Sequence, residues 1–406
     1  MESTPELMNK TVSEKKAVTS VGFIALTIAS PVMGLVLLVP AIPEIVEQFS
    51  ISENIGQSLI TFYLIALGLG QLGYGIASDR FGRRPILLLG SLFFGIGSAL
   101  ILLANSIEFL IFCRILQGLG AAACLSMGRA MIHDNYVRAE AAKHMSTAQT
   151  IQSTVPIMSV LFGGILVEFL GWKSGMVVSA IAGFTILAIT IFKLTETHKN
   201  KLPNINLGEI TTAYSSIFKN PLFMSFALTC GMQSGMFYVL AGILPYHYEA
   251  LGQSSLQFGL WFSIMPIGFF IGNFINRRFL VMRSIEIVAF SGSIITLISM
   301  VILFAEAYAG RLTPLSIALP CGLFGFGNGI LISNATIGAI SAAGKYAGTG
   351  SGFTGAWQMF AGASFGALIV VIGGTYNMLI TAGAIIGISV ISIICLSYAA
   401  THRTKL

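Results

Sequence analysis

The sequence predicts an all-α integral membrane protein of about twelve transmembrane helices, arranged as two six-helix halves. Three observations lead to this prediction: charged residues are scarce, apolar runs of membrane-spanning length recur, and basic residues alternate between loops. Only 9% of the 406 residues are charged and 55% are hydrophobic, whereas a soluble domain carries about 25% charged residues. So few charges cannot cover a globular surface, and the outer surface must therefore face lipid.

The apolar runs are long enough for membrane-spanning helices and too long for barrel strands. A helix needs about 20 apolar residues to cross the roughly 30 Å hydrocarbon core, and only helices or closed barrels satisfy their backbone there. The first run is too long for a cleavable signal peptide, so we expect it to remain as the first span. The expected spans lie near 18–43, 56–78, 85–104, 107–132, 145–170, 172–193, 221–250, 256–276, 284–304, 312–340, 347–371 and 375–399.

The positions of the basic residues test this helix count independently. Cytoplasmic loops collect Lys and Arg, and an N-terminus inside the cell makes both termini and every second loop cytoplasmic. All but three of the 22 basic residues then fall on or near that side, the exceptions being Arg114, Lys173 and Arg311. We therefore predict a multi-pass protein of a bacterial-type inner membrane, with both termini cytoplasmic. The net charge of +6 reflects this bias and not nucleic-acid binding.

The longest internal polar stretch predicts a linker between the two halves. Each half also contains a glycine-bearing helix end that runs into a basic turn, at 75–84 and at 268–278. Repeated halves are a known plan of secondary transporters, whose site lies between them near the midplane. The predicted division is a cytoplasmic tail 1–17, a first half 18–193, a cytoplasmic linker 194–220, a second half 221–399 and a cytoplasmic tail 400–406.

Two motifs resemble those of a known family. The turn after the second expected span reads Gly75-Ile-Ala-Ser-Asp79-Arg80-Phe-Gly82-Arg83-Arg84-Pro85 and resembles the loop signature of the major facilitator superfamily. The fourth span reads Leu110-x-x-x-Arg114-x-x-Gln117-Gly118-x-Gly120 and is similar to a signature of the drug/proton antiporter branch. The resemblance covers essentially the whole chain, and it looks closest to bicyclomycin- and chloramphenicol-resistance exporters. It implies a secondary active transporter with the major facilitator fold, working by alternating access and exporting drugs or small amphipathic metabolites, with protons as coupling ion.

The first motif also contains a candidate conformational latch. Asp79 lies at a helix end and is suited to meet the positive N-terminal dipole of a neighbouring helix. The resemblance implies that this helix begins near Gly348 and that Arg83 or Arg84 pairs with Asp134. Such contacts form only while the halves are closed on the cytoplasmic side, so they would stabilise that state alone. The alternative is a charge cluster that merely fixes topology. The latch comprises Gly75, Asp79, Arg80, Gly82, Arg83, Arg84 and Asp134.

Arg114 is the strongest single candidate for a residue of the transport site. An ionisable residue within a span is a functional candidate by default, and Gln117 lies one turn further on the same face. The alternatives for Arg114 are a structural role, bound to carbonyls, or a side chain that snorkels to the surface. Each amide of the candidate cavity could instead make an interhelical hydrogen bond, and each aromatic could be an interfacial anchor. The remaining cavity candidates are Gln149, Gln152, Gln233, Phe237, Tyr238, Asn328 and Asn334.

Two departures from the antiporter branch keep other functions open. The stretch 32–39 contains no acid before Pro40-Ala-Ile-Pro43, where the branch usually has one, and Ser159-Val160 replaces a Gly-Pro pair in the fifth span. A cavity with Arg114 and no acid favours neutral or anionic solutes. The alternatives are an importer, as symporter or uniporter, of a metabolite or siderophore-like chelate, and more remotely a transporter-shaped sensor.

The sequence shows no chemistry for an enzyme or a metalloprotein. It contains no nucleophile–base pair, metal-ligand cluster or phosphate-binding glycine loop, and its five cysteines lie in apolar runs, as reduced and buried residues do. We therefore expect no cofactor, no metal and no nucleic-acid partner. The expected partners are a small-molecule substrate, protons and the lipid bilayer, and the expected state is a monomer.

Overall fold

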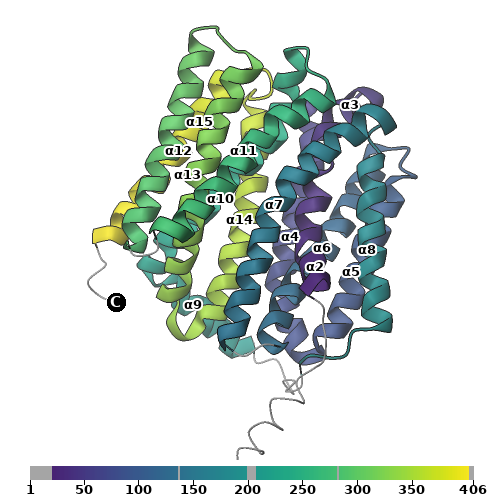
Figure 1. Cartoon of the computed structure of the whole chain (residues 1–406), viewed down its shortest axis with the longest axis vertical. Helices are drawn as coiled ribbons and strands as arrows, with labels where there is room; N and C mark the ends of the chain where they lie inside the picture. The colour runs from purple at the N-terminus through teal and green to yellow at the C-terminus, as the bar shows by residue number, and fades with distance from the viewer. Residues whose placement is uncertain (1–20, 136–137, 199–206, 281–282, 402–406) are drawn as a thin grey trace, which may run out of the picture.

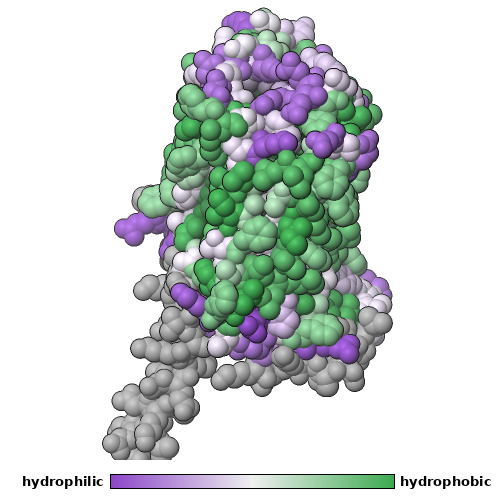
Figure 2. Space-filling view, turned by 90° about the vertical axis from the view of Figure 1, so that its right-hand side faces the viewer, coloured by the Kyte–Doolittle hydropathy of each residue, from purple (hydrophilic) through white to green (hydrophobic). Residues whose placement is uncertain are grey.

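The computed structural model describes residues 21–135, 138–198, 207–280 and 283–401, and it is helical throughout. Among these residues, 12 helices are long and apolar enough to cross a membrane, and none of the described residues forms a β-strand. The predicted fold class is confirmed. On the face shown in Figure 2, an apolar band lies between two polar ends, as expected of a protein surrounded by lipid.

The helices form two groups, which lie on opposite sides of Figure 1. The first group consists of α2 (Val21–Val36), η1 (Val39–Ala41), α3 (Ile42–Gln48), α4 (Glu53–Phe81), α5 (Arg83–Ile101), α6 (Ile107–Asn135), α7 (Arg138–Leu170) and α8 (Ser174–Phe192). The second consists of α10 (Pro221–Ala250), α11 (Ser255–Ile275), η2 (Asn276–Leu280), α12 (Ile285–Tyr308), α13 (Pro314–Ala342), η3 (Gly344–Tyr346), α14 (Ala347–Val371) and α15 (Met378–Thr401).

The expected linker at 194–220 contains a helix that the sequence interpretation did not include. This helix is α9 (Leu207–Phe218), in which apolar residues recur at helical spacing between polar ones. Ile217 is buried, and the ring of Phe218 packs edge-on against Phe353 of α14 at a centroid distance of 4.9 Å. The connection between the two groups is therefore attached to the second group by apolar contacts.

The first span is broken near its end. Helix α2 stops at Val36, and η1 and α3 continue to Gln48, because Pro40 and Pro43 have no N–H to donate along a helix. At the break, the N–H of Leu38 bonds to the carbonyl of Leu35 at 3.3 Å. Such a tightened turn leaves some carbonyls of the last helical turn without a helical partner.

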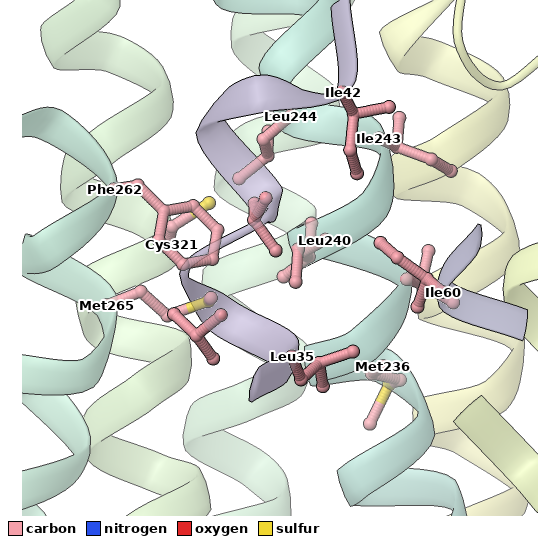
Figure 3. Packing of buried hydrophobic residues seen from close by; sticks show 14 of the residues in the cluster. Leu35, Ile42, Ile60, Met236, Leu240, Ile243, Leu244, Phe262, Met265 and Cys321 are labelled. Atoms are coloured by element: carbon pink, nitrogen blue, oxygen red, sulfur yellow. The ribbon is translucent and has the colours of Figure 1, made fainter. Parts of the chain in front are cut away.

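The two ends of the molecule are packed differently. At the end that holds α3, here called the α3 end, one hydrophobic cluster joins both groups. Figure 3 shows Leu35, Ile42 and Ile60 of the first group beside Leu240 and Ile243 of α10. At the opposite end, here called the Asp79 end, one cluster is built wholly from the first group and another wholly from the second. The groups are therefore joined at the α3 end and separate at the Asp79 end.

Two helix pairs bring the groups together, α4 with α14 and α7 with α11. In the second pair, glycines allow backbones to approach closely. A Cβ on Gly164 would lie 2.6 Å from the carbonyl oxygen of Ser255, and one on Gly259 would lie 2.9 Å from that of Val160. Since no side chain fits there, these glycines are required for the closure of the α3 end.

Candidate functional site

Arg114 lies on α6 inside the first group, with none of its surface exposed. Its Nη1 donates to the carbonyl of Gly34 at 2.8 Å and its Nε to the carbonyl of Leu59 at 3.2 Å. The guanidinium stacks on Tyr63 at 4.3 Å from the ring centroid. Nη2 has no hydrogen-bond partner among the described residues. Arg114 thus contacts α2 and α4 and does not line the space between the groups.

The carbonyl of Gly34 is one that the break of α2 leaves unpaired. In a continued helix the N–H of Leu38 would bond to this carbonyl, but it bonds instead to the carbonyl of Leu35, and the guanidinium of Arg114 takes its place. A positive charge at a helix C-terminus interacts favourably with the helix dipole. Arg114 therefore caps α2 at its break.

Gln117 extends this network to a fourth helix. Its Oε1 accepts from Arg114, and its Nε2 donates to Ser98 of α5 at 2.7 Å. The sequence placed Arg114 and Gln117 on one face, and the structure brings them into contact. Together they connect α2, α4, α5 and α6 by hydrogen bonds in the buried interior of the first group.

Three predicted polar residues form contacts inside the second group. Gln233 donates to Thr296 of α12 at 3.3 Å and to Ser392 of α15 at 3.2 Å. Asn328 of α13 donates to the carbonyl of Gln233 at 3.0 Å. Asn334 donates to Asn276 at 2.8 Å. Each of these amides makes the interhelical bond that the sequence left open as an alternative, although Oε1 of Gln233 and Oδ1 of Asn328 have no partner among the described residues.

Phe237 and Tyr238 lie where the two groups meet. Both pack against the cluster that joins the groups, and their rings meet edge-on at 5.5 Å. The hydroxyl of Tyr238 also contacts the sulfur of Met359 on α14 at 3.7 Å. Gln152 is half-buried on α7, and the side chain of Gln149 lies outside the described part of the structure. The aromatic pair is thus the part of the predicted cavity that stands at the interface.

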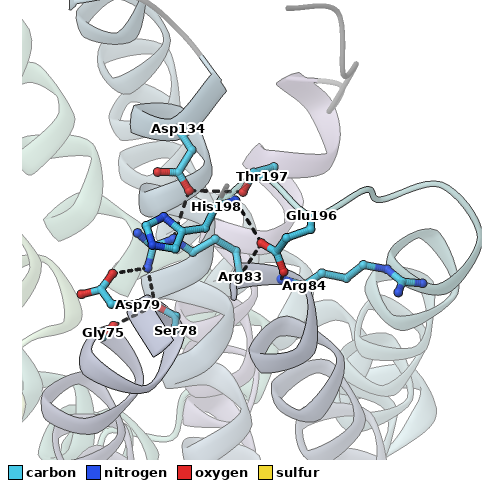
Figure 4. A network of polar contacts seen from close by, with 9 residues as sticks. All are labelled: Gly75, Ser78, Asp79, Arg83, Arg84, Asp134, Glu196, Thr197 and His198. Carbon is cyan, nitrogen blue, oxygen red and sulfur yellow. Dashed lines mark hydrogen bonds and ion pairs between the residues drawn. The ribbon is translucent and has the colours of Figure 1, made fainter. Parts of the chain in front are cut away.

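The turn between α4 and α5 holds the charged network shown in Figure 4. Arg83 pairs with Asp79 at 2.7 Å through Nη1 and with Asp134 at 3.0 Å through Nε. It also donates to Ser78. Gly82 has φ 103°, a region that favours glycine, and this allows α5 to begin immediately after α4 ends. Of the two arginines considered for the pair with Asp134, the structure selects Arg83.

Glu196 completes this network, and no role had been assigned to it. Its carboxylate accepts from the N–H of Arg83 at 2.8 Å and of Arg84 at 3.3 Å, the first residues of α5. It therefore caps that helix and complements its dipole. The Arg84 side chain donates to the carbonyl of Ile191 at 3.1 Å, whereas Arg80 lies against the ring of Phe81. An acidic residue just beyond the end of α8 was the only sequence signal for Glu196.

Asp79 does not reach α14 in this structure. Its side chain is 43% exposed, and no hydrogen bond or ion pair joins it to the described residues of α14. A Cβ on Gly75, Gly348 or Gly352 would meet no atom within 4 Å, so the helix ends that would face each other are apart. The network in Figure 4 contains residues of the first group and of the segment just beyond α8, and none of the second group. A latch between the groups stays a prediction for a state closed at this end.

A cavity of about 510 Å³ lies between the two groups at the α3 end. The carboxylates of Glu44 and Glu47 on α3, Glu168 on α7 and Glu249 on α10 line it. Within the described residues, no three His, Cys, Asp or Glu side chains are placed to hold a metal ion. Four acidic residues thus gather at the mouth of the closed end, while Arg114 lies inside the first group.

The described residues form twelve apolar helices in two groups, which are joined at one end and separate at the other, and this arrangement defines a polytopic membrane protein of the transporter class. Residues 22–367 match the Major Facilitator Superfamily, and the chain belongs to that family. The resemblance inferred from the two motifs is confirmed. Members of this family move solutes and are not enzymes, so transport is the activity of this fold here.

Individual relatives agree with this assignment. The chain is 31% identical over 248 residues to the uncharacterized MFS-type transporter YdgK of Bacillus subtilis, an alignment that spans 60% of this chain and 61% of the relative. It is 26% identical to a bicyclomycin resistance protein homolog of Haemophilus influenzae, over 89% of this chain and 92% of that one. The nucleoside transporter NupG has the same fold, with a TM-score of 0.75 over 93% of this chain and 98% of that one, at 11% identity.

Proposed function

We propose that this protein is a secondary active exporter of drugs or small amphipathic metabolites, that it works by alternating access, and that protons are its coupling ion. The observation that supports the mechanism most is the uneven packing of the two groups, with a joint cluster at the α3 end and separate clusters at the Asp79 end. A carrier that alternates must close one end while the other is open. The similarity to a bicyclomycin resistance protein homolog supports export of drug-like solutes.

The distribution of basic residues supports one orientation in the membrane. With both termini cytoplasmic, in a bacterial-type inner membrane, the Asp79 end faces the cytoplasm and the structure is an inward-facing state. The halves 18–193 and 221–399 then rock against each other as units within a monomer, and the linker 194–220 joins them on the cytoplasmic side. In the opposite, outward-facing state, Asp79 would approach the N-terminus of α14 near Gly348.

The contacts of the candidate residues support different roles in this cycle. We infer that Phe237 and Tyr238 contact the solute, because they lie at the joint between the groups. Arg114 and Gln117 act as positioning residues, because they fix α2 and α4, two helices that contribute to that joint. Gln233, Asn328 and Asn334 do the same for the second group, as their partners on neighbouring helices indicate.

Transport into proteoliposomes under an imposed pH gradient tests the proposal. Bicyclomycin, chloramphenicol, a siderophore and an amino-acid-like anion would be screened with both polarities of the gradient. We expect a drug-like solute to move against the direction of proton flow. Movement of the siderophore or the anion in the same direction as protons would favour the importer, and movement of any solute independent of the gradient would exclude proton coupling.

The latch is tested in the same assay with Asp79→Asn, since this change removes the charge that would meet α14. We expect slower transport with normal membrane insertion. Glu306→Gln is the matched control, because Glu306 also pairs with an arginine, Arg311 at 3.5 Å, at the opposite end of the protein. Equal transport rates for the two variants would leave the charged turn with a topological role only.

A further inference from the structure

Gln57 crosses the boundary between the two groups at the α3 end. It lies on α4 and is 1% exposed. A Cβ on Gly242 of α10 would lie 2.2 Å from its Oε1, and a Cβ on Gly366 of α14 would lie 2.7 Å from its Nε2. The amide of Gln57 therefore sits in a socket formed by two glycines of the second group, and any larger residue at Gly242 would occupy the place of the amide.

The amide of Gln57 has no hydrogen-bond partner among the described residues, at either Oε1 or Nε2. A primary amide offers two donors and two acceptor sites, and a buried polar group without a partner carries an energetic cost that water would remove. This cost arises only while the α3 end is closed, because separation of α4 from α10 and α14 would expose the amide. The unpaired amide thus destabilises the closed α3 end relative to the open one.

A second polar group at the same boundary is also unpaired. Tyr246 of α10 is 6% exposed, and its hydroxyl has no partner among the described residues. A Cβ on Gly56 of α4 would lie 2.6 Å from that hydroxyl. The closure of the α3 end therefore buries polar groups from both sides, next to the apolar cluster that holds the groups together.

We propose that Gln57, in its socket of Gly242 and Gly366, is a positioning residue that keeps the closure of the α3 end reversible. The joint apolar cluster stabilises the closed end, and the unpaired amide offsets part of this stabilisation, so that the open state remains populated. The inference rests on the alternating access proposed above. It concerns the equilibrium between two states of the empty protein and does not require contact between Gln57 and solute.

Three variants test the socket. Gln57→Leu keeps a side chain of similar size without polar atoms, and it should lower the ratio of open to closed α3 ends roughly 5- to 150-fold and slow transport. Gly242→Ala should shift the ratio toward the open end, because its methyl group collides with the amide. Adding Gln57→Ala to Gly242→Ala should reverse that shift. Gly387→Ala on α15 is the control, since a Cβ there meets no atom within 4 Å.

Distances measured by pulsed electron–electron double resonance on the full-length protein would report the populations of the open and closed states at each end. In a background whose five cysteines are replaced, spin labels at Leu103 and Tyr308 report the α3 end, and labels at Phe192 and Ile287 report the Asp79 end. All four side chains are exposed. The pairs would be measured in nanodiscs without solute at two pH values, and transport of the unlabelled variants would be measured in parallel.

The outcomes separate this proposal from alternating access itself. Two populations at each end in the wild type, with the three expected shifts, would support the socket. Two populations with an unchanged ratio in Gln57→Leu, or no reversal in the double variant, would overturn it, and a raised KM in Gln57→Leu would then assign Gln57 to solute contact. A single population at both ends under all conditions would contradict the alternating access on which the proposal rests.

Discussion

Replacing Arg114 by alanine distinguishes a role in positioning helices from a role in binding solute. The side chain is fully buried, and its guanidinium bonds to the carbonyls of Gly34 and Leu59. If these bonds are its main function, the alanine variant should lose stability in the absence of any solute. If Arg114 instead binds solute, the variant should keep its stability and lose the effect of solute.

The structure gives the magnitude of the stability loss that is expected if Arg114 positions helices. Without the guanidinium, the Gly34 carbonyl becomes a buried acceptor with no partner, at a cost of about 1–3 kcal/mol. Loss of the charge also removes the interaction with the C-terminal dipole of α2, worth ~0.3–1 kcal/mol and up to ~2 kcal/mol in a buried site. The expected decrease in the free energy of unfolding is therefore about 1–5 kcal/mol. Arg114→Lys keeps the charge but not the fork-shaped donor, so its loss should be smaller.

Thermal unfolding of purified protein in detergent, with and without a solute found to be transported, is the appropriate assay. Arg311→Ala is the control, because Arg311 is 70% exposed and its pair with Glu306 spans 3.5 Å. An exposed pair of this kind contributes about 0–1 kcal/mol. A melting temperature of Arg114→Ala equal to that of Arg311→Ala, combined with no stabilisation by solute, would refute the capping role and assign Arg114 to solute binding.

Three further predictions concern the charged turn and the topology. Gly82→Ala should destabilise the protein by about 1–3 kcal/mol, because φ 103° is strained for any residue with a Cβ; an unchanged melting temperature would contradict this. Glu196→Ala should lower the free energy of unfolding by about 0.5–2 kcal/mol, because α5 loses its cap. Glu196→Gln should lower it less, since one acceptor oxygen remains, and a measured order opposite to this would exclude the cap. Single cysteines at Asn200 and Gln253 should label from opposite sides of the membrane, and labelling of both from the periplasm would overturn the orientation.

The sequence could predict the scaffold because its signals are local. A membrane span is defined by length and hydropathy, and a loop by its charges, so the helix count and the family follow without knowledge of contacts. The sequence predicted one span that ends at 43, whereas the structure breaks this span after Val36, before Pro40 and Pro43, and continues it to Gln48. Helix α9 was missed because its apolar residues form only one face within a short polar stretch, which composition alone does not separate from a linker.

The sequence could not predict the partners of the polar residues, because those partners lie far along the chain. Arg114 was identified from its own position, but the carbonyl that it caps is 80 residues away and becomes available only because α2 breaks. Gln57 gave no signal at all, since a single glutamine near a helix end is unremarkable until Gly242 and Gly366 pack around it.

By itself the sequence determined that the chain is a transporter of the major facilitator type with about twelve spans, that a basic turn follows the second span, and that an arginine lies within the fourth span. Only the tertiary structure decided which end of the protein is closed, that Arg83 and not Arg84 pairs with Asp134, and which polar groups are buried without partners. The physical reason is that hydropathy and periodicity act along one helix. Closure and hydrogen-bond satisfaction depend instead on how separate helices meet, which is decided by side-chain size and backbone approach at positions distant in sequence.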